Sequence, residues 1–402
     1  MQRPDPQTLA PSAGTRRPRD PRIDAFRGLA LVTIFVDHVP GNPYEQVTLR
    51  NWGFSDAAEA FFIMSGIAAG LAYSGALASG PFWAGAKPVW RRAWLLYLVH
   101  LCLSLWAIAI FAAGADVFGL PALLEKNNLG AVFQKTGEAL VGLPLLLHQL
   151  GYVNILPVYS VLLLCTPFAI RVGRTNPWWL AGGAVALWFA AGLWRLNFPN
   201  YPNPGGWFFN PFSWQLVFVL GLLTGVRMRQ GARFVPKRPV LLWIAGMWLL
   251  LVLAWRLSPD LAALLNHQMA RLGALGAPFH LISHDKTFLA LPRLLHALAL
   301  VYVLSCSATV RRAAGHVAAA PLRLLGRHGL LVFSVGTLLS LLMQVALAAL
   351  PAPDAAAWGL IPLGILAMLA VAWIAEARRQ TSAPRMVAGA PLTALAPRHP
   401  DS

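Results

Sequence analysis

The chain has 402 residues, a net charge of +17, 57% hydrophobic residues and only 12% charged residues. Soluble domains carry about 25% charged residues, so this composition excludes an ordinary soluble protein. The apolar runs are continuous rather than alternating, which argues against a β-barrel. We predict an all-α, polytopic membrane helix bundle of about ten transmembrane helices. The segments expected to span are 23–39, 54–74, 92–114, 152–171, 177–195, 212–228, 238–257, 286–306, 327–350 and 357–376.

The positive charge would suit a nucleic-acid partner, but its distribution indicates membrane topology instead. Most of the 32 Lys and Arg residues fall in the two tails and in alternate connections between spans. Cytoplasmic loops are rich in Lys and Arg. We therefore predict that both termini are cytoplasmic, in agreement with an even number of spans, and we expect the lipid bilayer rather than nucleic acid as a partner. The three cysteines lie in separate predicted spans and indicate no disulfide framework.

One integral membrane domain, residues 21–378, accounts for almost the whole chain. Residues 1–20 are rich in Pro and Arg, and residues 379–402 are rich in Pro, so we expect two disordered cytoplasmic tails. The first span is not followed by a small-residue cleavage site, so we expect it to be retained. Two long connections, 196–211 and 258–285, are expected to cap the outer face.

The first span, "RIDAFRGLALVTIFVDHV", carries polar groups near both ends. These are Asp24, Arg27, Asp37 and His38. Asp20 and Pro21 predict the N-cap and the first helical residue. Asp24 and Arg27 are three residues apart and can pair on one face at the inner interface. His38 follows Arg27 by about three helical turns, so both lie on one stripe about 16 Å apart. The alternative is that these groups only anchor the span, with Arg27 reaching toward water.

The second span, "NWGFSDAAEAFFIMSGIAAGLAYS", runs in the opposite direction. Glu59 therefore lies near the outer end, at a depth close to His38. A carboxylate beside an imidazole raises its basicity and orients it as a general base. The alternative is a capping box with Asp56 as N-cap and Glu59 at N3. Gly66 and Gly70 are four residues apart, which favours close packing against another helix.

More polar side chains converge on the same outer half in later spans. Arg293 and His296 share a face of the eighth span, and an Arg at that depth is rarely structural without a partner. The further candidates for substrate binding are His148, Asn154, Trp214, Gln215, Arg293 and His296. Trp214 and its aromatic neighbours either stack on a sugar or form an interfacial aromatic belt. His280 and His284 form an isolated HxxxH pair, and we expect no metal site.

Several of these segments resemble the OpgC family. The resemblance is strongest in "RIDAFRGLALVTIFVDH" and "GFSDAAEAFFIMSGIAAGLAY", and it continues in "LLLHQLGYVNILPVYSVLLLCTP", "FNPFSWQLVFVLG" and "LPRLLHALALVY". It covers roughly residues 20–345. The family belongs with the broader acyltransferase-3 superfamily, whose first-span motif of an Arg followed eleven residues later by a His is similar to Arg27 and His38.

The resemblance implies a multi-pass O-acyltransferase of the bacterial inner membrane. It would move a succinyl or similar acyl group from cytoplasmic acyl-CoA, as co-substrate, to hydroxyls of periplasmic glucans, without a bound cofactor. Glucan-synthesis proteins would be further partners. His38 would be the general base or the acyl acceptor, with Glu59 and Asp37 beside it. Asp24 and Arg27 would meet the donor, together with Arg91, Arg92, Arg171 and Arg174, and Arg293 would hold an acidic acyl group.

Two other classes of function remain open. A transporter or flippase for an acyl donor or a glycan would use intramembrane His, Glu and Arg as a relay or substrate pathway. Such folds often show paired halves with broken helices, and this sequence has no evident internal symmetry. An inactive membrane assembly partner is the third possibility. Dependence on acyl-CoA separates the acyltransferase from both.

Overall fold

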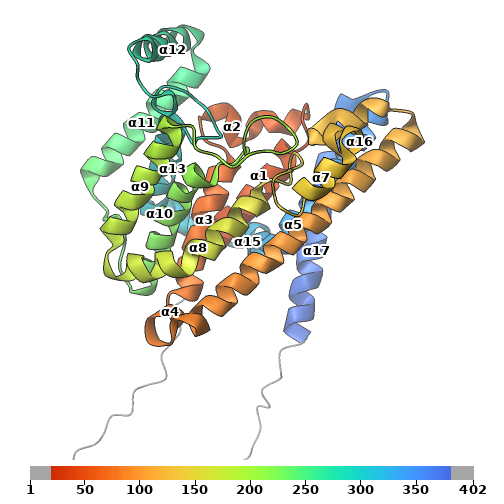
Figure 1. Ribbon diagram of the computed structural model, residues 1–402. Coiled ribbons are helices and arrows are strands. Elements are labelled where there is room, and N and C mark those ends of the chain that lie inside the picture. The colour runs from red at the N-terminus through yellow and green to blue at the C-terminus, as the bar shows by residue number, and fades with distance from the viewer. Residues whose placement is uncertain (1–19, 382–402) are drawn as a thin grey trace, which may run out of the picture.

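The computed structural model describes residues 20–381. Within that range the chain is a helix bundle without a β-strand, so the all-α class is confirmed (Figure 1). The predicted tails, 1–20 and 379–402, lie outside the described residues apart from Asp20 and the last residues of α17, which continues to Thr381.

Each of the ten predicted spans coincides with a helix. These are α1 (Pro21–Asp37), α3 (Ala57–Tyr73), α5 (Phe82–Phe118), α8 (Ile155–Thr175), α9 (Pro177–Leu193), α10 (Pro211–Arg229), α11 (Pro239–Leu257), α13 (Leu291–Cys306), α16 (Gly329–Ala349) and α17 (Pro353–Thr381). Six of them are long and apolar enough to cross a membrane: α5, α8, α10, α11, α16 and α17. A seventh crossing results if α13 and α14 (Ala308–Gly315), which meet at 77°, form one bent span. The chain is therefore a multi-pass membrane protein, while ten crossings and cytoplasmic termini stay predictions.

Further helices, most of them short, fill the connections between these ten. They are η1 (Pro43–Val47), α2 (Leu49–Trp52), α4 (Ala76–Ser79), η2 (Pro121–Asn128), α6 (Gly130–Gln134), α7 (Thr136–Gly142), α12 (Pro259–Ala274), η3 (Phe279–Leu281), η4 (Val317–Ala319) and α15 (Ala320–Arg327). The longest, α12, lies at one extremity of the molecule (Figure 1). Its start is set by Ser258, whose hydroxyl accepts from the Leu261 amide, and by Pro259 in the first turn.

Local signals in the sequence place the starts of α1 and α3 as predicted. Asp20 caps α1 by accepting a hydrogen bond from the Arg22 amide at 3.0 Å. Asp56 accepts from the Ala58 amide, and Glu59 accepts from the Asp56 amide at 2.8 Å, which confirms the capping box. These bonds satisfy backbone donors that the first turn of a helix leaves free.

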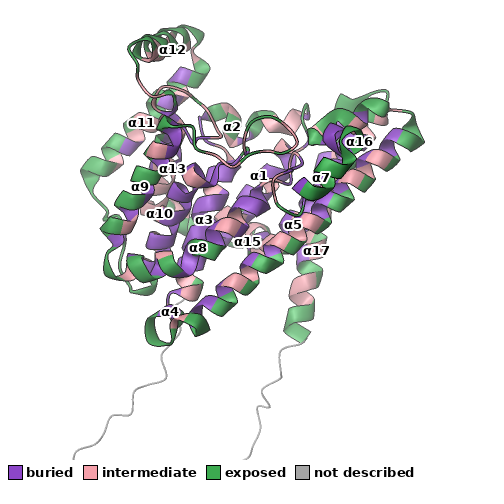
Figure 2. Ribbon diagram, viewed as in Figure 1, coloured by how far each residue is buried: buried purple, intermediate pink, exposed green. Residues whose placement is uncertain are grey.

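The centre of the bundle is the contact between α3 and α10, where glycines let two backbones touch. A Cβ on Gly66 would lie 2.1 Å from the Phe218 carbonyl oxygen, and one on Gly221 would lie 2.2 Å from that of Ile63. The predicted packing role of Gly66 and Gly70 is thus confirmed, with Gly221 and Gly225 as the matching pair on α10. Buried residues concentrate in these inner helices and exposed ones at the periphery (Figure 2). Of the residues in the apolar 18-residue stretch of each helix, 72% are buried in α10 and 17% in α11.

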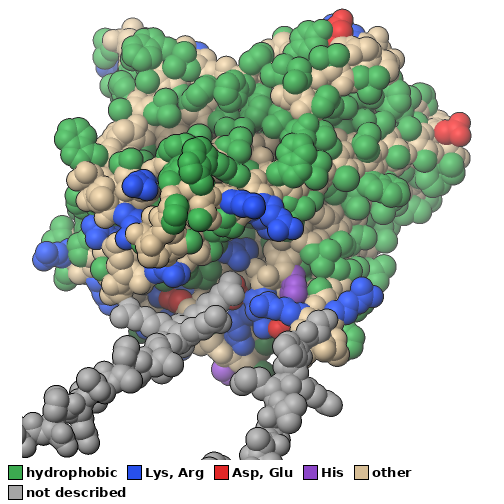
Figure 3. Space-filling model, turned by 60° about the horizontal axis from the view of Figure 1, so that its bottom comes forward, with side chains coloured by type: hydrophobic (Ala, Val, Ile, Leu, Met, Phe, Trp, Pro, Cys, Tyr) green, Lys and Arg blue, Asp and Glu red, His purple; other side chains and the backbone are tan. Residues whose placement is uncertain are grey.

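The two ends of the bundle are named here by their residues. The His38 end is where α1 finishes at Asp37 and α3 begins at Ala57. The tail end is where α1 begins at Pro21 and α17 finishes at Thr381. Lys and Arg side chains gather on the face that includes the tail end (Figure 3).

Candidate functional site

The tail end of α1 holds the predicted ion pair. Arg27 Nη1 lies 3.8 Å from Asp24 Oδ1 and donates to the Gly326 carbonyl at 3.2 Å. The short helix α15 presses on α1 here, since a Cβ on Gly326 would lie 1.9 Å from the Asp24 carbonyl oxygen. The prediction that Asp24 and Arg27 pair is confirmed, and the Gly326 carbonyl of α15 contacts the same Arg27 nitrogen.

His38 ends α1 and is held through both its backbone and its ring. Its amide donates to the Ile34 carbonyl at 3.0 Å, and its carbonyl accepts from Gln344 Nε2 at 2.7 Å. Its imidazole packs on the Tyr152 ring with the centroids 4.6 Å apart. Nδ1 is buried without a hydrogen-bond partner in the described chain. Nε2 also lacks a hydrogen-bond partner there and is not among the fully buried atoms.

Asp37 precedes His38 but directs its carboxylate elsewhere. Asp37 Oδ1 accepts from Thr48 Oγ1 at 2.8 Å, and that hydroxyl also contacts the Glu45 carbonyl at 2.7 Å. Asp37 therefore ties the end of α1 to the connection that contains η1 and α2. A catalytic role for Asp37 stays a prediction.

Four charged side chains meet where α3 and α13 begin, and they are called the charge cluster here. They are Asp56, Glu59, Lys286 and Arg293. Lys286 Nζ lies 2.5 Å from Asp56 Oδ2. Arg293 Nη2 lies 2.6 Å from Glu59 Oε1 and 3.1 Å from Asp56 Oδ2, and its Nε donates to the same Glu59 oxygen at 2.9 Å. Two carboxylates thus balance two cations.

Glu59 is predicted from the sequence to orient the His38 imidazole, but both of its carboxylate oxygens bond to other residues. Oε1 accepts from Arg293 and Oε2 accepts from the Asp56 amide. Among the described residues no hydrogen bond joins Glu59 to His38. The physical reason is the buried guanidinium, which is a stronger partner for a carboxylate than a neutral imidazole. The sequence predicts that an Arg this deep in a span needs a partner, and Glu59 is a partner of Arg293.

His296 lies one turn further along α13 and pairs with Ser55. Ser55 Oγ and His296 Nδ1 are 2.6 Å apart, and the Ser55 amide also donates to Nδ1 at 3.3 Å. Nδ1 therefore accepts, which places the proton of a neutral ring on Nε2. Gly53 leaves room for the ring, because a Cβ there would lie 2.2 Å from His296 Cε1.

The remaining candidates from the sequence analysis occupy different surroundings. His148 is fully buried, and Asn154 precedes α8 without a capping bond from its side chain. Trp214 is also fully buried and donates from Nε1 to the Lys286 carbonyl at 3.0 Å. Gln215 donates to the Ala184 carbonyl at 2.7 Å and so joins α10 to α9.

The two histidines of the HxxxH pair contact different neighbours. His280 packs against Trp188 and Phe189, whereas His284 Nε2 lies 3.3 Å from Asn266 Oδ1. Burial lowers the pKa of the His284 imidazole, and Arg256 and Arg293 lower it further. Within residues 20–381 no three His, Cys, Asp or Glu side chains are grouped to hold a metal ion.

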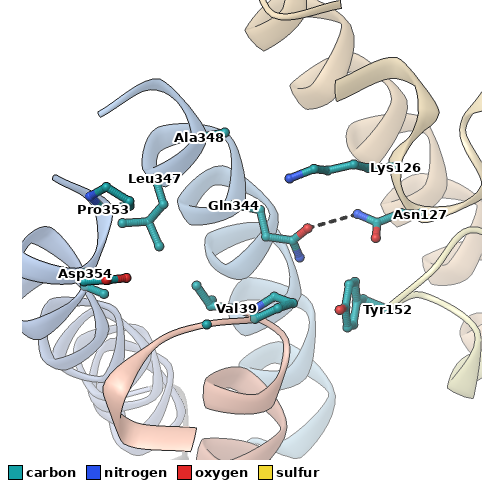
Figure 4. Close-up of a pocket in the computed structure, with 12 residues that line it drawn as sticks. Val39, Lys126, Asn127, Tyr152, Gln344, Leu347, Ala348, Pro353 and Asp354 are labelled. Atoms are coloured by element: carbon teal, nitrogen blue, oxygen red, sulfur yellow. Dashed lines mark hydrogen bonds between the residues drawn. The ribbon is translucent and has the colours of Figure 1, made fainter. Parts of the chain in front are cut away.

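A cavity of about 370 Å³ adjoins His38 (Figure 4). Val39, the residue after His38, and Tyr152, which packs on the imidazole, both line it, and Gln344 reaches from it to the His38 carbonyl. The lining is completed by Pro40, Gly41, Lys126, Asn127, Leu347, Ala348, Pro353, Asp354 and Ala357.

Sequence reasoning missed Lys286, Ser55, Tyr152 and Gln344 as parts of this region. A usable signal existed for Lys286, because it precedes Arg293 by seven residues, or two turns, in the same predicted span. The others reach the site through long-range contacts that a single sequence does not reveal.

Comparison with known proteins identifies one family. The family model described as OpgC protein matches residues 19–380. A search of curated proteins and a search of solved structures each gave no match.

Proposed function

The chain belongs to the OpgC family, and from this premise we propose that it is a membrane O-acyltransferase that acts on periplasmic glucans. The donor is acyl-CoA, with succinyl as the acyl group that the family resemblance favours. The proposal sets the protein in the bacterial inner membrane, with the tail end in the cytoplasm and the His38 end in the periplasm.

One observation carries the proposal. A single helix, α1, carries Arg27 about two turns from its start and is followed directly by His38, whose Nε2 has no hydrogen-bond partner in the described chain. At 1.5 Å per residue these residues are about 16 Å apart along the axis. A cytoplasmic donor can therefore place its phosphates near Arg27 while its thioester reaches toward His38. An inactive assembly partner has no need of an unpartnered imidazole nitrogen at the end of this helix.

The proposed reaction needs one proton acceptor. His38 Nε2 takes the proton from a glucan hydroxyl as that oxygen attacks the thioester carbonyl. The carbon–sulfur bond then breaks, the ester forms, and the coenzyme A sulfur takes the proton back from the imidazolium. Atoms and charge balance without an oxidant or a metal ion. Tyr152 packs on the ring and Gln344 holds the His38 backbone, so both contacts help to position His38 for this transfer.

The charge cluster supports the site rather than the chemistry in this proposal. The charge of Arg293 is balanced by Glu59 and Asp56, so an acyl carboxylate would have to compete with two protein carboxylates. The cluster joins the beginnings of α3 and α13 beside α1. We assign Arg293 and Glu59 to positioning these helices.

The test is the acyl-ester content of periplasmic glucans. Three strains are compared: one with the intact protein, one without it, and one with His38→Ala. The proposal expects succinyl esters only in the first strain, with the variant present in the membrane at a normal level. Glucans that are unchanged in all three strains would contradict it.

A further inference from the structure

The cavity beside His38 differs from a lipid-filled gap in the chemistry of its walls. One side presents Lys126, Asn127 and Tyr152, and the other presents Leu347, Ala348 and Asp354, with Gln344 between them (Figure 4). Its volume of about 370 Å³ falls within the roughly 300–1,000 Å³ of pockets that bind small molecules. An aromatic ring with a few convergent polar groups is typical of such pockets.

Several polar groups in this cavity are available to a ligand. In the described chain no hydrogen bond or ion pair involves Lys126 Nζ, the Asp354 carboxylate or the Tyr152 hydroxyl. The cavity thus offers donors on Lys126 and Tyr152 and acceptors on Asp354 and Tyr152. One cation faces one anion, so the lining carries no net charge that would favour a phosphate or another anion. A neutral molecule with many hydroxyl groups suits this set best.

The wall of the cavity that includes Asn127 and Tyr152 is held in an uncommon backbone conformation. Asn127 and Tyr152 both have positive φ values, of 57° and 68°. Such values are uncommon for residues other than glycine and carry a free-energy cost that the surrounding structure must offset. The two loops meet where the Gly151 amide donates to the Asn127 carbonyl at 2.8 Å. Strained residues of this kind cluster at ligand sites.

A chain of hydrogen bonds connects this wall to His38. Asn127 Nδ2 donates to Gln344 Oε1 at 3.1 Å, and Gln344 Nε2 donates to the His38 carbonyl at 2.7 Å. Tyr152 makes a second connection, because its ring lines the cavity and also packs on the imidazole. Whatever binds in the cavity is therefore placed with respect to His38.

We propose that this cavity, between the ends of α1 and α16, the start of α17 and the loops at Asn127 and Tyr152, is a binding site for a neutral saccharide unit of the acceptor. The inference rests on the proposed function, because it names where the acceptor glucan binds. Lys126, Asp354 and the Tyr152 hydroxyl contact sugar hydroxyl groups, while Leu347 and the Tyr152 ring contact its apolar face. A neighbouring sugar then reaches His38 Nε2 from the same end of the bundle.

The first test fills the cavity without changing a polar group. Leu347→Trp places a larger side chain into it, and Leu342→Trp is the matched control, because Leu342 lies on the same helix and is 49% exposed. The full-length protein is purified in detergent, and its binding of neutral glucan oligosaccharides is measured by saturation-transfer NMR and equilibrium dialysis. We expect Leu347→Trp to weaken binding at least tenfold and Leu342→Trp to leave it unchanged.

The second test removes one polar group. Asp354→Ala is compared with Asp260→Ala, because both aspartates follow a proline that begins a helix, α17 and α12 respectively. Only Asp354 lines the cavity. We expect the KM for the glucan to rise about three- to tenfold in Asp354→Ala, while the KM for acyl-CoA stays unchanged in both variants.

The outcomes separate the inference from the proposed function. Wild-type glucan affinity in Leu347→Trp and Asp354→Ala, in a protein that does acylate glucans, would overturn the cavity assignment alone. Loss of glucan binding in these variants, in a protein that acylates no glucan, would support the cavity and overturn the transferase. Equal loss in the control variants would also refute the assignment, because it would indicate a general effect on the fold.

Discussion

Replacing Arg293 with Met tests how the charge cluster holds the His38 end together. The change removes the one cation that hydrogen-bonds to Glu59 in the described chain. The Glu59 side chain is 1% exposed, so its charge would stay buried with only the Asp56 amide as a donor. Breaking a buried pair by removing one partner costs about 3–5 kcal/mol. Asp56 keeps Lys286 at 2.5 Å and adds little to that loss.

The opposite substitution is expected to cost less. Glu59→Gln removes the charge but keeps one oxygen, which can accept from Arg293 or from the Asp56 amide, although not from both, because these donors bond to different oxygens of Glu59. Arg293 also keeps Asp56 at 3.1 Å. A hydrogen bond to a charged group contributes about 1.5–3 kcal/mol, so weakening one should cost about 1–2 kcal/mol. The double variant should lose less than the two single losses combined, by at least about 1 kcal/mol.

The assay is reversible unfolding in mixed micelles, followed by circular dichroism. The control is Arg50→Met, because Arg50 pairs with Glu45 at 3.6 Å but is 47% exposed. Exposed pairs contribute about 0–1 kcal/mol. Additive losses in the double variant, or a loss in Arg293→Met no larger than in Arg50→Met, would refute the account of a buried, mutually dependent cluster.

Two further predictions concern helix packing and donor binding. Gly66→Val should destabilise the protein by about 1–3 kcal/mol, because the new side chain meets the α10 backbone. The control is Gly183→Val on α9, where the added side chain has open space. The control should therefore lower the thermal unfolding midpoint in detergent far less than Gly66→Val does. A midpoint shift of the same size in both variants would contradict the packing argument. Arg27→Gln should raise the KM for acyl-CoA about tenfold but leave the KM for the matching acyl-pantetheine unchanged, because that donor lacks the nucleotide phosphates. An equal rise for both donors, measured by thiol release, would exclude a phosphate contact.

Much of the fold was predictable because its signals are local in the sequence. The ten apolar segments each coincide with a helix, and the caps at Asp20 and Asp56 follow from residue type and spacing alone. The small residues at Gly66 and Gly70 predicted a close helix contact. The short helices in the connections were not predicted, because their apolar runs are brief and their exposed faces resemble loops.

The site was predictable only in part, because its geometry depends on contacts between distant segments. The Asp24–Arg27 pair could be foreseen, since both residues lie on one helix. The partner of Glu59 could not, because Arg293 is 234 residues away in the chain. Tyr152 and Gln344 reach His38 from two other segments. Spacing within one helix is fixed by its geometry, whereas the neighbours of that helix depend on the whole packing arrangement.

The most direct test of acyl transfer across the membrane uses the purified protein in liposomes. Radiolabelled acyl-CoA is supplied on the side of the tail end, and neutral glucan on the side of the His38 end, with wild-type protein and His38→Ala compared. Label is expected to reach the glucan only with the wild-type protein and only when the two substrates are on these opposite sides. Labelled glucan with His38→Ala, or transfer only when both substrates are on one side, would contradict this expectation.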